Sequence, residues 1–513
     1  MYLTQGLHRS LQQTPNGVAV VDRGTDVTFT ELADRVARLA AALADVGAVK
    51  GDRIGVLAAN SVRYLEYALA CPWGGFAVAP VNSRWSVGEM AYQVLDADIA
   101  VLIVDDEAAS TAVALQEKCP GLTALIHCGL DPTPDGMLGY EDLIARTSAI
   151  DDVRLTGSDL AGILYTGGTT GQPKGVMVSP SQLLVSGLGA LASAGMSNER
   201  ERFLHVAPLY HLASLGSFYQ QVQLGSTHFV LGRFTVEGVA DSIARDGITA
   251  VTLVPTMIQR LFDHAEATGA DLSSLVHLGY GASPISEPVL RKALQMLPDL
   301  QMCQRYGMTE LGPVATVLRP EEHRDETHPE RLRSAGRAAL HAELRVVDGM
   351  DTDVATREVG EVIVRGSNLM LGYWKKPAET AAALRGGWMH TGDLGYLDED
   401  GYLYIVDRLK DMIVTGGENV YSAEVEKVLA MHDSIASCAV IGVPDERWGE
   451  RVHAVVVATA GSSPDADQLR EFCAERIGRY KAPCTVEVVD ELPLSAVGKI
   501  LKCTLREQYR TQP

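Results

Sequence analysis

Residues 165–175 combine the residue types that bind phosphate groups. They read YTGGTTGQPKG and directly follow the apolar run 162–164. Glycines let backbone N–H groups turn toward an anion, hydroxyls add donors, and a lysine supplies a compact positive charge. The segment therefore predicts a loop that leaves a strand and binds the phosphates of a nucleotide. The residues expected to contact them are Thr166, Gly167, Gly168, Thr169, Thr170 and Lys174.

Two other interpretations of this loop fit its sequence less well. A Walker A loop requires a lysine that follows glycine and precedes Ser or Thr, whereas here Pro173 precedes Lys174 and Gly175 follows it. A flexible surface linker seldom combines this density of glycine, threonine and lysine with an apolar strand in front. We therefore expect a nucleotide site of another type.

A second segment, residues 304–310, reads QRYGMTE and follows an expected strand. Tyr306 offers an aromatic face for a nucleobase, Gly307 a flexible backbone, Thr309 a hydroxyl for a phosphate, and Glu310 a carboxylate for Mg²⁺. Alone these residues do not define a site, because Tyr-Gly is common in turns and a single glutamate is usually solvated. Their interpretation depends on the other motifs.

Four further positions carry groups suited to nucleotide chemistry. Asp393 can accept two hydrogen bonds from the cis-diol of a ribose, and Arg408 follows downstream. The alternative is that Asp393 only caps a turn at the preceding glycine. Lys499, in a Gly-Lys-Ile run, and His211, in a Pro-Leu-Tyr-His run, would in isolation be interpreted as a solvated tail charge and a packed structural residue.

Together these motifs resemble, in type and in order, those of the adenylate-forming superfamily, which includes acyl-CoA synthetases, firefly luciferases and the adenylation domains of peptide synthetases. The resemblance covers nearly the whole chain. It implies that Tyr306 stacks on adenine, that Thr309 contacts the α-phosphate, and that Glu310 binds Mg²⁺. Thr170 is expected to share the metal.

The resemblance also assigns the remaining motifs. It implies that Asp393 and Arg408 bind the ribose and that Lys499 stabilises the charge that builds at the α-phosphate. Lys410 matches the hinge before a small C-terminal domain. His211 is implied among the catalytic residues with Thr309, Glu310 and Lys499. Further nucleotide or CoA contacts are expected at Gly281, Ala282, Ser283, Gly416, Gly417, Glu418 and Trp448, and acyl contacts at Tyr210, His211, Leu215, Tyr280 and Gly307.

The reaction implied by the resemblance has two halves. A carboxylate attacks the α-phosphate of Mg·ATP to give an acyl-adenylate and pyrophosphate, and the thiol of CoA then attacks the adenylate. Thioester formation on a carrier protein and oxidation of a luciferin are the alternatives within the superfamily. CoA is favoured because the segments 416–419 and 448–450 are similar to those of ligases and no carrier domain follows residue 513. A non-catalytic nucleotide-binding or acyl-binding relative is the alternative outside enzymes.

Three positions depart from the family pattern: Gly168 stands where Ser is usual, Arg305 where Gly is frequent, and Val497 where a small residue is common. The segments expected to line the acyl pocket, 210–215, 256–257 and 278–282, contain no Lys or Arg. An uncharged tail, fatty or aromatic, is therefore expected rather than a dicarboxylate. Arg305 would count against this expectation if its side chain pointed into the pocket.

Composition narrows the class of protein. The chain has 513 residues and a formal net charge of −21, which disfavours nucleic acids and anionic membranes as partners. Its eight cysteines are scattered without metal spacing, which suggests buried thiols and a cytoplasmic protein. The start of the chain has no signal-peptide pattern, and Pro and Gly interrupt the weakly charged stretch 67–81. A homodimer remains open.

The pattern of elements predicts an α/β protein of about three folding units. Strands alternate with helices in two doubly wound α/β subdomains, for example a helix capped by Thr30 and ended by Gly47, and a capping box at Ser86 and Glu89. Residues 335–406 are expected to form a small β-barrel or twisted antiparallel sheet. These parts make up an N-terminal domain, 1–409, followed by a mobile α+β domain, 410–513. The expected strands are 53–58, 76–81, 99–104, 229–231, 250–254, 275–278, 435–443, 452–458 and 485–489, and the last expected helix is 466–477.

Overall fold

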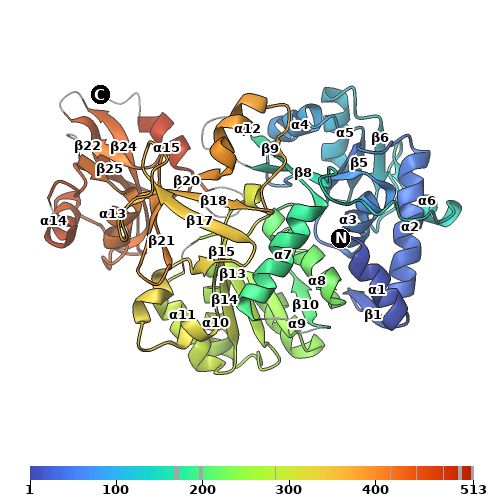
Figure 1. Ribbon diagram of the computed structural model, residues 1–513, viewed down its shortest axis with the longest axis horizontal. Helices are drawn as coiled ribbons and strands as arrows, with labels where there is room; N and C mark the ends of the chain where they lie inside the picture. The colour runs from blue at the N-terminus through green and yellow to red at the C-terminus, as the bar shows by residue number, and fades with distance from the viewer. Residues whose placement is uncertain are drawn as a thin grey trace. The chain divides into compact units, whose positions relative to one another are not determined.

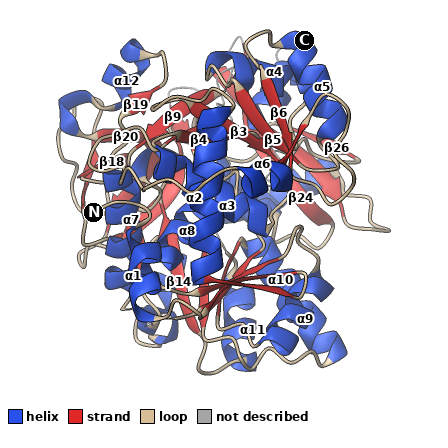
Figure 2. Cartoon of the chain, turned by 90° about the vertical axis from the view of Figure 1, so that its right-hand side faces the viewer, coloured by secondary structure: helices blue, strands red, loops and turns tan. Residues whose placement is uncertain are grey.

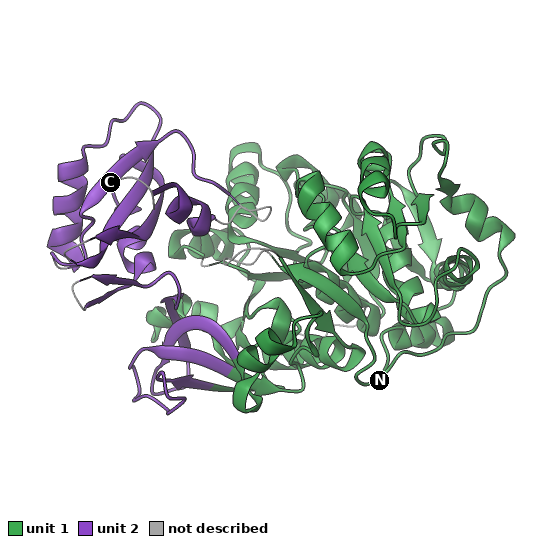
Figure 3. Cartoon of the chain, turned by 90° about the horizontal axis from the view of Figure 1, so that it is seen from above, with its two compact units in different colours: residues 1–166, 173–344, 364–389 green, residues 167–172, 345–363, 390–513 purple. Residues whose placement is uncertain are grey.

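The computed structural model describes residues 1–166, 173–195, 200–283, 285–415, 418–445, 448–477, 479–494 and 500–509. The described chain divides into two compact units, coloured separately in Figure 3. The first comprises 1–166, 173–344 and 364–389, and the second comprises 345–363 and the described residues from 390 onward. The strands β20 and β21 thus belong to the same unit as the C-terminal elements. The expected division at 409/410 concerns motion and stays a prediction.

The first unit contains an eight-stranded sheet in the order β19-β9-β8-β4-β3-β5-β6-β7. β4, β3, β5 and β6 are parallel neighbours, and β9 is antiparallel to both β8 and β19. The strands are β3 (Arg53–Leu57), β4 (Ala77–Pro80), β5 (Val101–Val104), β6 (Ala124–His127), β7 (Leu138–Gly139), β8 (Gly162–Thr166), β9 (Lys174–Val178) and β19 (Gly372–Tyr373). The helices in this part of the chain are α2 (Phe29–Asp45), α3 (Val62–Gly74), α4 (Val87–Asp96), α5 (Ala109–Lys118), α6 (Tyr140–Arg146) and α12 (Pro377–Ala383).

The helix caps show which local signals determine these elements. α4 begins at the expected capping box, in which Ser86 and Glu89 bond each other's backbone N–H groups. α2 begins two residues earlier than expected, because Thr28 rather than Thr30 accepts the N–H of Glu31 and completes a capping box. Gly47 follows the last turn with a φ of 106°, as a C′ glycine does.

The second sheet of this unit has nine strands in the order β16-β15-β14-β13-β12-β10-β11-β1-β2. The run from β14 to β1 is parallel. The strands are β1 (Val18–Asp22), β2 (Thr25–Thr28), β10 (Arg202–His205), β11 (Thr227–Val230), β12 (Ala250–Leu253), β13 (His277–Gly281), β14 (Gln301–Tyr306), β15 (Thr316–Leu318) and β16 (Arg337–Ala338). The helices are α1 (Gln5–Gln13), α7 (Pro180–Ala194), α8 (Leu212–Leu224), α9 (Val236–Asp246), α10 (Pro255–Thr268) and α11 (Glu287–Met296), with short 3₁₀ turns η1 (Thr309–Leu311), η2 (Glu321–Arg324), η3 (Pro329–Arg333) and η4 (Arg385–Gly387).

The two faces of this sheet are covered by different helices. Helices α9, α10 and α11 gather on one side and pack over a core that includes Leu278 and Tyr280 of β13 (Figures 1 and 2). Helix α7 packs on the other face, where Leu191 lies in a cluster with Cys303 of β14. Because side chains alternate along a strand, His277 and Gly279 lie on this second face.

A four-stranded sheet in the order β17-β18-β20-β21 has most of its residues in the second unit, and β17 and β21 form its two edges. Its strands are β17 (Ala342–Val347), β18 (Gly360–Gly366), β20 (Met389–Leu397) and β21 (Leu403–Arg408), and they occupy the region expected to be a barrel or twisted sheet. The α+β part adds β22 (Ile413–Thr415), β23 (Glu418–Val420), β24 (Ile435–Asp445), β25 (Gly449–Ala458), β26 (Thr485–Val489), α13 (Ser422–Leu429), α14 (Ala466–Ile477) and α15 (Lys502–Tyr509). In the part of the chain that the structure describes, no helix has the length and apolarity needed to cross a membrane.

Candidate nucleotide and acyl site

Glu310 is held in a fixed position directly after β14. It lies in the turn η1 and is buried. The hydroxyl of Tyr373 donates to Glu310 Oε1 at 2.9 Å, and the N–H of Met370 donates to the Glu310 carbonyl at 2.8 Å. Burial and the neighbouring Glu310 carboxylate raise the pKa of Tyr373, so its hydroxyl stays a proton donor. The carboxylate that the sequence assigned to a metal is therefore oriented by a tyrosine.

The same tyrosine contacts the lysine of the phosphate-binding motif. Lys174, the first residue of β9, has its Nζ 5.0 Å from the centroid of the Tyr373 ring. Its Nζ also pairs with Glu379 Oε2 at 2.5 Å. Tyr373 reaches this position because β19 pairs with β9, with Tyr373 opposite Val176. Two motifs that are more than a hundred residues apart, those of Lys174 and Glu310, thus meet at one side chain.

The ends of β13 and β14 bring together other predicted residues at the carboxyl edge of the parallel strands. Gly281 lies opposite Arg305, and a Cβ at Gly281 would lie 2.3 Å from the Arg305 carbonyl oxygen. Ala282, directly after β13, has a left-handed φ of 67°, a conformation that costs energy for alanine. Gly307 has a φ of 158°, and a Cβ there would lie 2.1 Å from the Pro313 carbonyl oxygen.

This edge is where open α/β sheets bind their ligands. Gly281, Ala282, Ser283, Tyr306 and Gly307 all lie in it, and their nucleotide contacts stay predictions. The close backbone approaches at both glycines leave no space for a side chain at either position. Strain at Ala282 is consistent with a turn that is shaped by function rather than by stability.

In the second unit, Asp393 and Arg408, the two residues of the ribose hypothesis, form an ion pair. They lie opposite each other on β20 and β21, and Arg408 Nε is 2.5 Å from Asp393 Oδ1. The Asp393 side chain is 7% exposed and that of Arg408 is 42% exposed. The buried carboxylate is thus bound to a cation that solvent can reach.

The turn that carries Asp393 is held by other groups. The Thr391 hydroxyl donates to the Val362 carbonyl at 2.7 Å and accepts the Asp393 N–H at 3.0 Å. Glu361 Oε1 accepts the N–H of Gly392 at 3.1 Å, and its Oε2 lies 2.9 Å from His390 Nδ1. Gly392 has a left-handed φ of 67°. Thr391 and Glu361 therefore stabilise the turn, and the side chain of Asp393 forms the ion pair described above.

The residues predicted to contact the acyl group do not share one environment. Tyr210 and His211 stand before α8 with ring centroids 4.4 Å apart, and burial raises the pKa of Tyr210. Leu215 is buried in the core of the first unit. Tyr280 lies in the core under α9–α11, and its hydroxyl is 2.7 Å from His323 Nε2. It therefore lies on the face of the sheet opposite His277 and Gly279, and its acyl role stays a prediction without a supporting contact.

Several predicted residues fall outside the described residues: Gly167, Gly168, Thr169, Thr170, Gly416, Gly417 and Lys499. Of their neighbours, Thr166 ends β8, Glu418 begins β23, and Trp448 is exposed in the second unit. Lys410 lies in the turn between β21 and β22, where the N–H groups of Asp411 and Met412 both donate to the Arg408 carbonyl. The roles of all these residues stay predictions.

Comparisons with known proteins place this arrangement in a family. Residues 7–374 match the AMP-binding enzyme family, and residues 424–499 match the AMP-binding enzyme C-terminal domain. The chain belongs to the AMP-binding enzyme family. It is 38% identical, over 98% of both chains, to a feruloyl-CoA synthase of Amycolatopsis. It is 34% identical to a fatty acid–[acyl-carrier-protein] ligase of Streptomyces coeruleorubidus, over 97% of this chain and 94% of the relative.

A solved structure extends the likeness to the fold. The o-succinylbenzoate CoA synthetase of Bacillus subtilis, in complex with its acyl-adenylate intermediate, matches with a TM-score of 0.86 and 30% identity. The match covers 99% of this chain and 98% of that one. The expected superfamily and fold class are therefore confirmed for this AMP-binding enzyme.

Sequence reasoning missed the residues that position the predicted ones: Tyr373 and Glu379 beside Lys174, and Thr391 and Glu361 beside Asp393. The pairing of β19 with β9 joins segments that are distant in the chain, and β19 has only two residues. No local pattern indicates such a pairing. Thr391 directly precedes Gly392 and Asp393 in the sequence, and its small hydroxyl before a glycine is the signal that was available.

Proposed function

We propose that this chain is an AMP-forming carboxylate–CoA ligase that activates a carboxylic acid as an acyl-adenylate and transfers the acyl group to CoA. The observation that carries the proposal is the likeness to a feruloyl-CoA synthase along 98% of both chains, which includes the C-terminal domain. The pairing of Asp393 with Arg408 and the anchored carboxylate of Glu310 support it, because both are groups that the first half-reaction needs.

In the first half-reaction the proposed roles follow from the chemistry of each group. Asp393 accepts hydrogen bonds from the ribose hydroxyls. Lys174 supplies positive charge to the phosphates and exchanges Glu379 for them when ATP binds. Tyr306 offers a ring to the adenine. Lys499, outside the described residues, is proposed to stabilise charge at the α-phosphate during the displacement.

The proposal includes Mg²⁺ as part of the substrate Mg·ATP. The described residues contain no group of three or more His, Cys, Asp or Glu side chains that could hold a metal. A single buried carboxylate, Glu310, nevertheless fits this ion, because Mg²⁺ in nucleotide sites is usually held by one or two carboxylates together with substrate phosphates. When bound, the metal neutralises phosphate charge. Thr170 is a proposed second contact outside the described residues.

A second candidate acceptor is the thiol of a carrier protein. It is favoured by the similarity, at 34% identity, to a ligase that loads an acyl carrier protein. The adenylation half is the same for both acceptors, so the two proposals differ only in the second half-reaction.

The experiment that tests the function measures pyrophosphate release with ATP and a panel of carboxylic acids. AMP and thioester are then quantified with CoA and, separately, with a pantetheinylated carrier protein. Pyrophosphate release that depends on the acid, followed by acyl-CoA formation, is the expected result. Transfer to the carrier protein but not to CoA would show that the carrier thiol, rather than CoA, is the acceptor. If no acid leads to pyrophosphate release, the adenylating function is refuted.

A further inference from the structure

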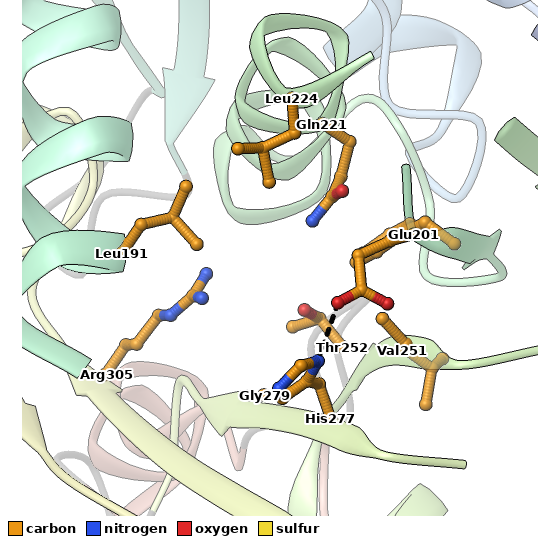
Figure 4. Close-up of a pocket in the computed structure, with 11 residues that line it drawn as sticks. Leu191, Glu201, Gln221, Leu224, Val251, Thr252, His277, Gly279 and Arg305 are labelled. Carbon is orange, nitrogen blue, oxygen red and sulfur yellow. Dashed lines mark hydrogen bonds and ion pairs between the residues drawn. The ribbon is translucent and has the colours of Figure 1, made fainter. Parts of the chain in front are cut away.

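A small cavity lies under the second sheet of the first unit, on the face covered by α7 and α8. Its volume is about 30 Å³. Side chains from α7, α8, β10, β12, β13 and β14 line it, among them Gln221, Thr252, Glu201, His277 and Arg305 (Figure 4). Gly279 also lines it, and the lack of a side chain at this position leaves space beside Thr252. The walls are therefore unusually polar for the interior of a sheet–helix layer.

Arg305 points its guanidinium group into this cavity, as Figure 4 shows. Its Nη1 donates to Gln220 Oε1 at 3.3 Å, while its Nε is buried and has no hydrogen-bond partner among the described residues. Gln220 is itself anchored, because its Nε2 donates to the Gly187 carbonyl at 3.1 Å. Among the described residues no carboxylate forms an ion pair with Arg305. The Arg305 side chain is partly buried, and a guanidinium group that gives up part of its hydration without gaining an anion is stabilised when a ligand supplies one.

The one carboxylate in the cavity wall is engaged elsewhere. Glu201 Oε1 lies 2.7 Å from His277 Nδ1, and the Thr249 hydroxyl donates to Glu201 Oε2. Figure 4 shows the Glu201–His277 pair across the cavity from Arg305. Arg305 and this pair therefore face the same space from two sides.

The cavity lies close to the expected reacting centre. Arg305 directly precedes Tyr306, and Gly279 lies two residues before Gly281 on the same face of β13. With a rise of about 3.3 Å per residue, the cavity starts roughly 7 Å below the carboxyl edge of the strands. An acid whose carboxyl group reacts at that edge and whose body is short would place its far end beside Arg305.

We propose that the acid has a second carboxylate at the end remote from the one that is adenylated, and that Arg305 binds it. This inference rests on the proposed function. A guanidinium group matches a carboxylate with two parallel hydrogen bonds, which would employ the unpartnered Nε. The small volume selects a compact acid rather than a long fatty chain. The sequence predicted an uncharged tail because the segments expected to line the acyl pocket contain no Lys or Arg. The cation is instead supplied by Arg305, which lies on the neighbouring strand β14.

The first test needs only the wild-type enzyme. Pyrophosphate release with ATP and CoA is measured at pH 8 for two matched pairs of acids, glutarate with pentanoate and terephthalate with benzoate. A dicarboxylate should exceed its partner in kcat/KM by about 100-fold, since a site built for a polar group strongly rejects the analogue that lacks it. A preference for the monocarboxylate in both pairs would overturn the inference. Failure of all four acids, and of every other acid in the panel, would instead refute the proposed function.

The second test uses variants. Arg305→Met should remove most of the dicarboxylate preference and leave the monocarboxylate rate within a few-fold, and Arg305→Lys should keep part of the preference. Arg202→Met is the matched control, because Arg202 lies on β10 of the same sheet and bonds the Asp246 carbonyl away from the cavity. If kcat/KM falls equally for the dicarboxylate and the monocarboxylate in a folded Arg305→Met enzyme, Arg305 has a structural role, in which water joins it to Glu201. If Arg305→Met does not fold, the wild-type comparison and Arg305→Lys decide.

Discussion

Removing one oxygen atom tests the arrangement at Glu310. Tyr373→Phe deletes the hydroxyl that donates to Glu310 Oε1 at 2.9 Å and keeps the ring beside Lys174. Both side chains are buried, at 8% and 5% exposure, and the acceptor is a carboxylate. A hydrogen bond to a charged group contributes about 1.5–3 kcal/mol. A loss of about 2 kcal/mol would correspond to roughly a 30-fold effect if all of it appeared in the transition state for adenylation.

We expect kcat/KM for Mg·ATP to fall by about 10- to 30-fold in this variant, measured as exchange of pyrophosphate into ATP with a saturating acid. Tyr140→Phe is a matched control, because the Tyr140 hydroxyl donates to the buried Glu66 carboxylate at 2.7 Å outside the candidate site. Tyr140→Phe should lower the free energy of unfolding about as much as Tyr373→Phe does, and it should leave kcat/KM for Mg·ATP unchanged.

A double-mutant cycle with Glu310→Gln completes the test. The two substitutions should couple by about 1–2 kcal/mol, because one removes the donor of this hydrogen bond and the other removes the charge of its acceptor. Wild-type kcat/KM in Tyr373→Phe, or a coupling energy below about 0.3 kcal/mol, would refute the conclusion that this tyrosine positions Glu310 for nucleotide chemistry.

Three predictions concern the other parts of the proposed cycle. Lys499→Ala should slow adenylation by about 100-fold or more, as loss of a donor to developing charge does, and should spare thioester formation from synthetic acyl-adenylate; equal loss in both halves would make the lysine structural. Asp393→Ala should weaken ATP binding and reduce the additional penalty for 2′-deoxy-ATP, measured by calorimetry, whereas an unchanged penalty would remove Asp393 from the ribose site. Lys410→Pro should keep acyl-adenylate formation and lose transfer to CoA in single-turnover assays, because a hinge with a fixed φ cannot reach both conformations, and Lys410→Ala should keep both; a proline variant that still transfers at the wild-type rate would contradict the hinge.

Much of the fold was predictable because its signals are local. The capping box at Ser86, the C′ glycine at Gly47 and the helix α14 at Ala466–Ile477 all agree with the expectations from sequence. The shift of the α2 cap from Thr30 to Thr28 shows the limit of such signals. Two threonines compete there, and the glutamate three residues after Thr28 decides between them.

The site was predictable where its motifs belong to known patterns and not where it depends on packing. The resemblance to the superfamily's ribose-binding motif gave the pair Asp393 and Arg408, and the antiparallel register of β20 and β21 explains why the two residues meet. Side chains alternate along β13, so Tyr280 lies on the face opposite the cavity. The sequence does not show which helices cover each face, so it could not exclude Tyr280 from the acyl pocket. The direction of the Arg305 side chain likewise depends on tertiary packing.

The pairing of β19 with β9 also affects how the chain is made. β9 ends at Val178 with β8 on one side, and the strand that pairs with its other side among the described residues is β19, which begins at Gly372. At a synthesis rate of about 5–20 residues per second, the roughly 200 residues between them take on the order of 10–40 s to emerge. During that time an apolar strand edge stays open on the ribosome, and such edges recruit other strands. A truncated product that ends before β19 should therefore aggregate, even though most of the N-terminal sheet has already been synthesised.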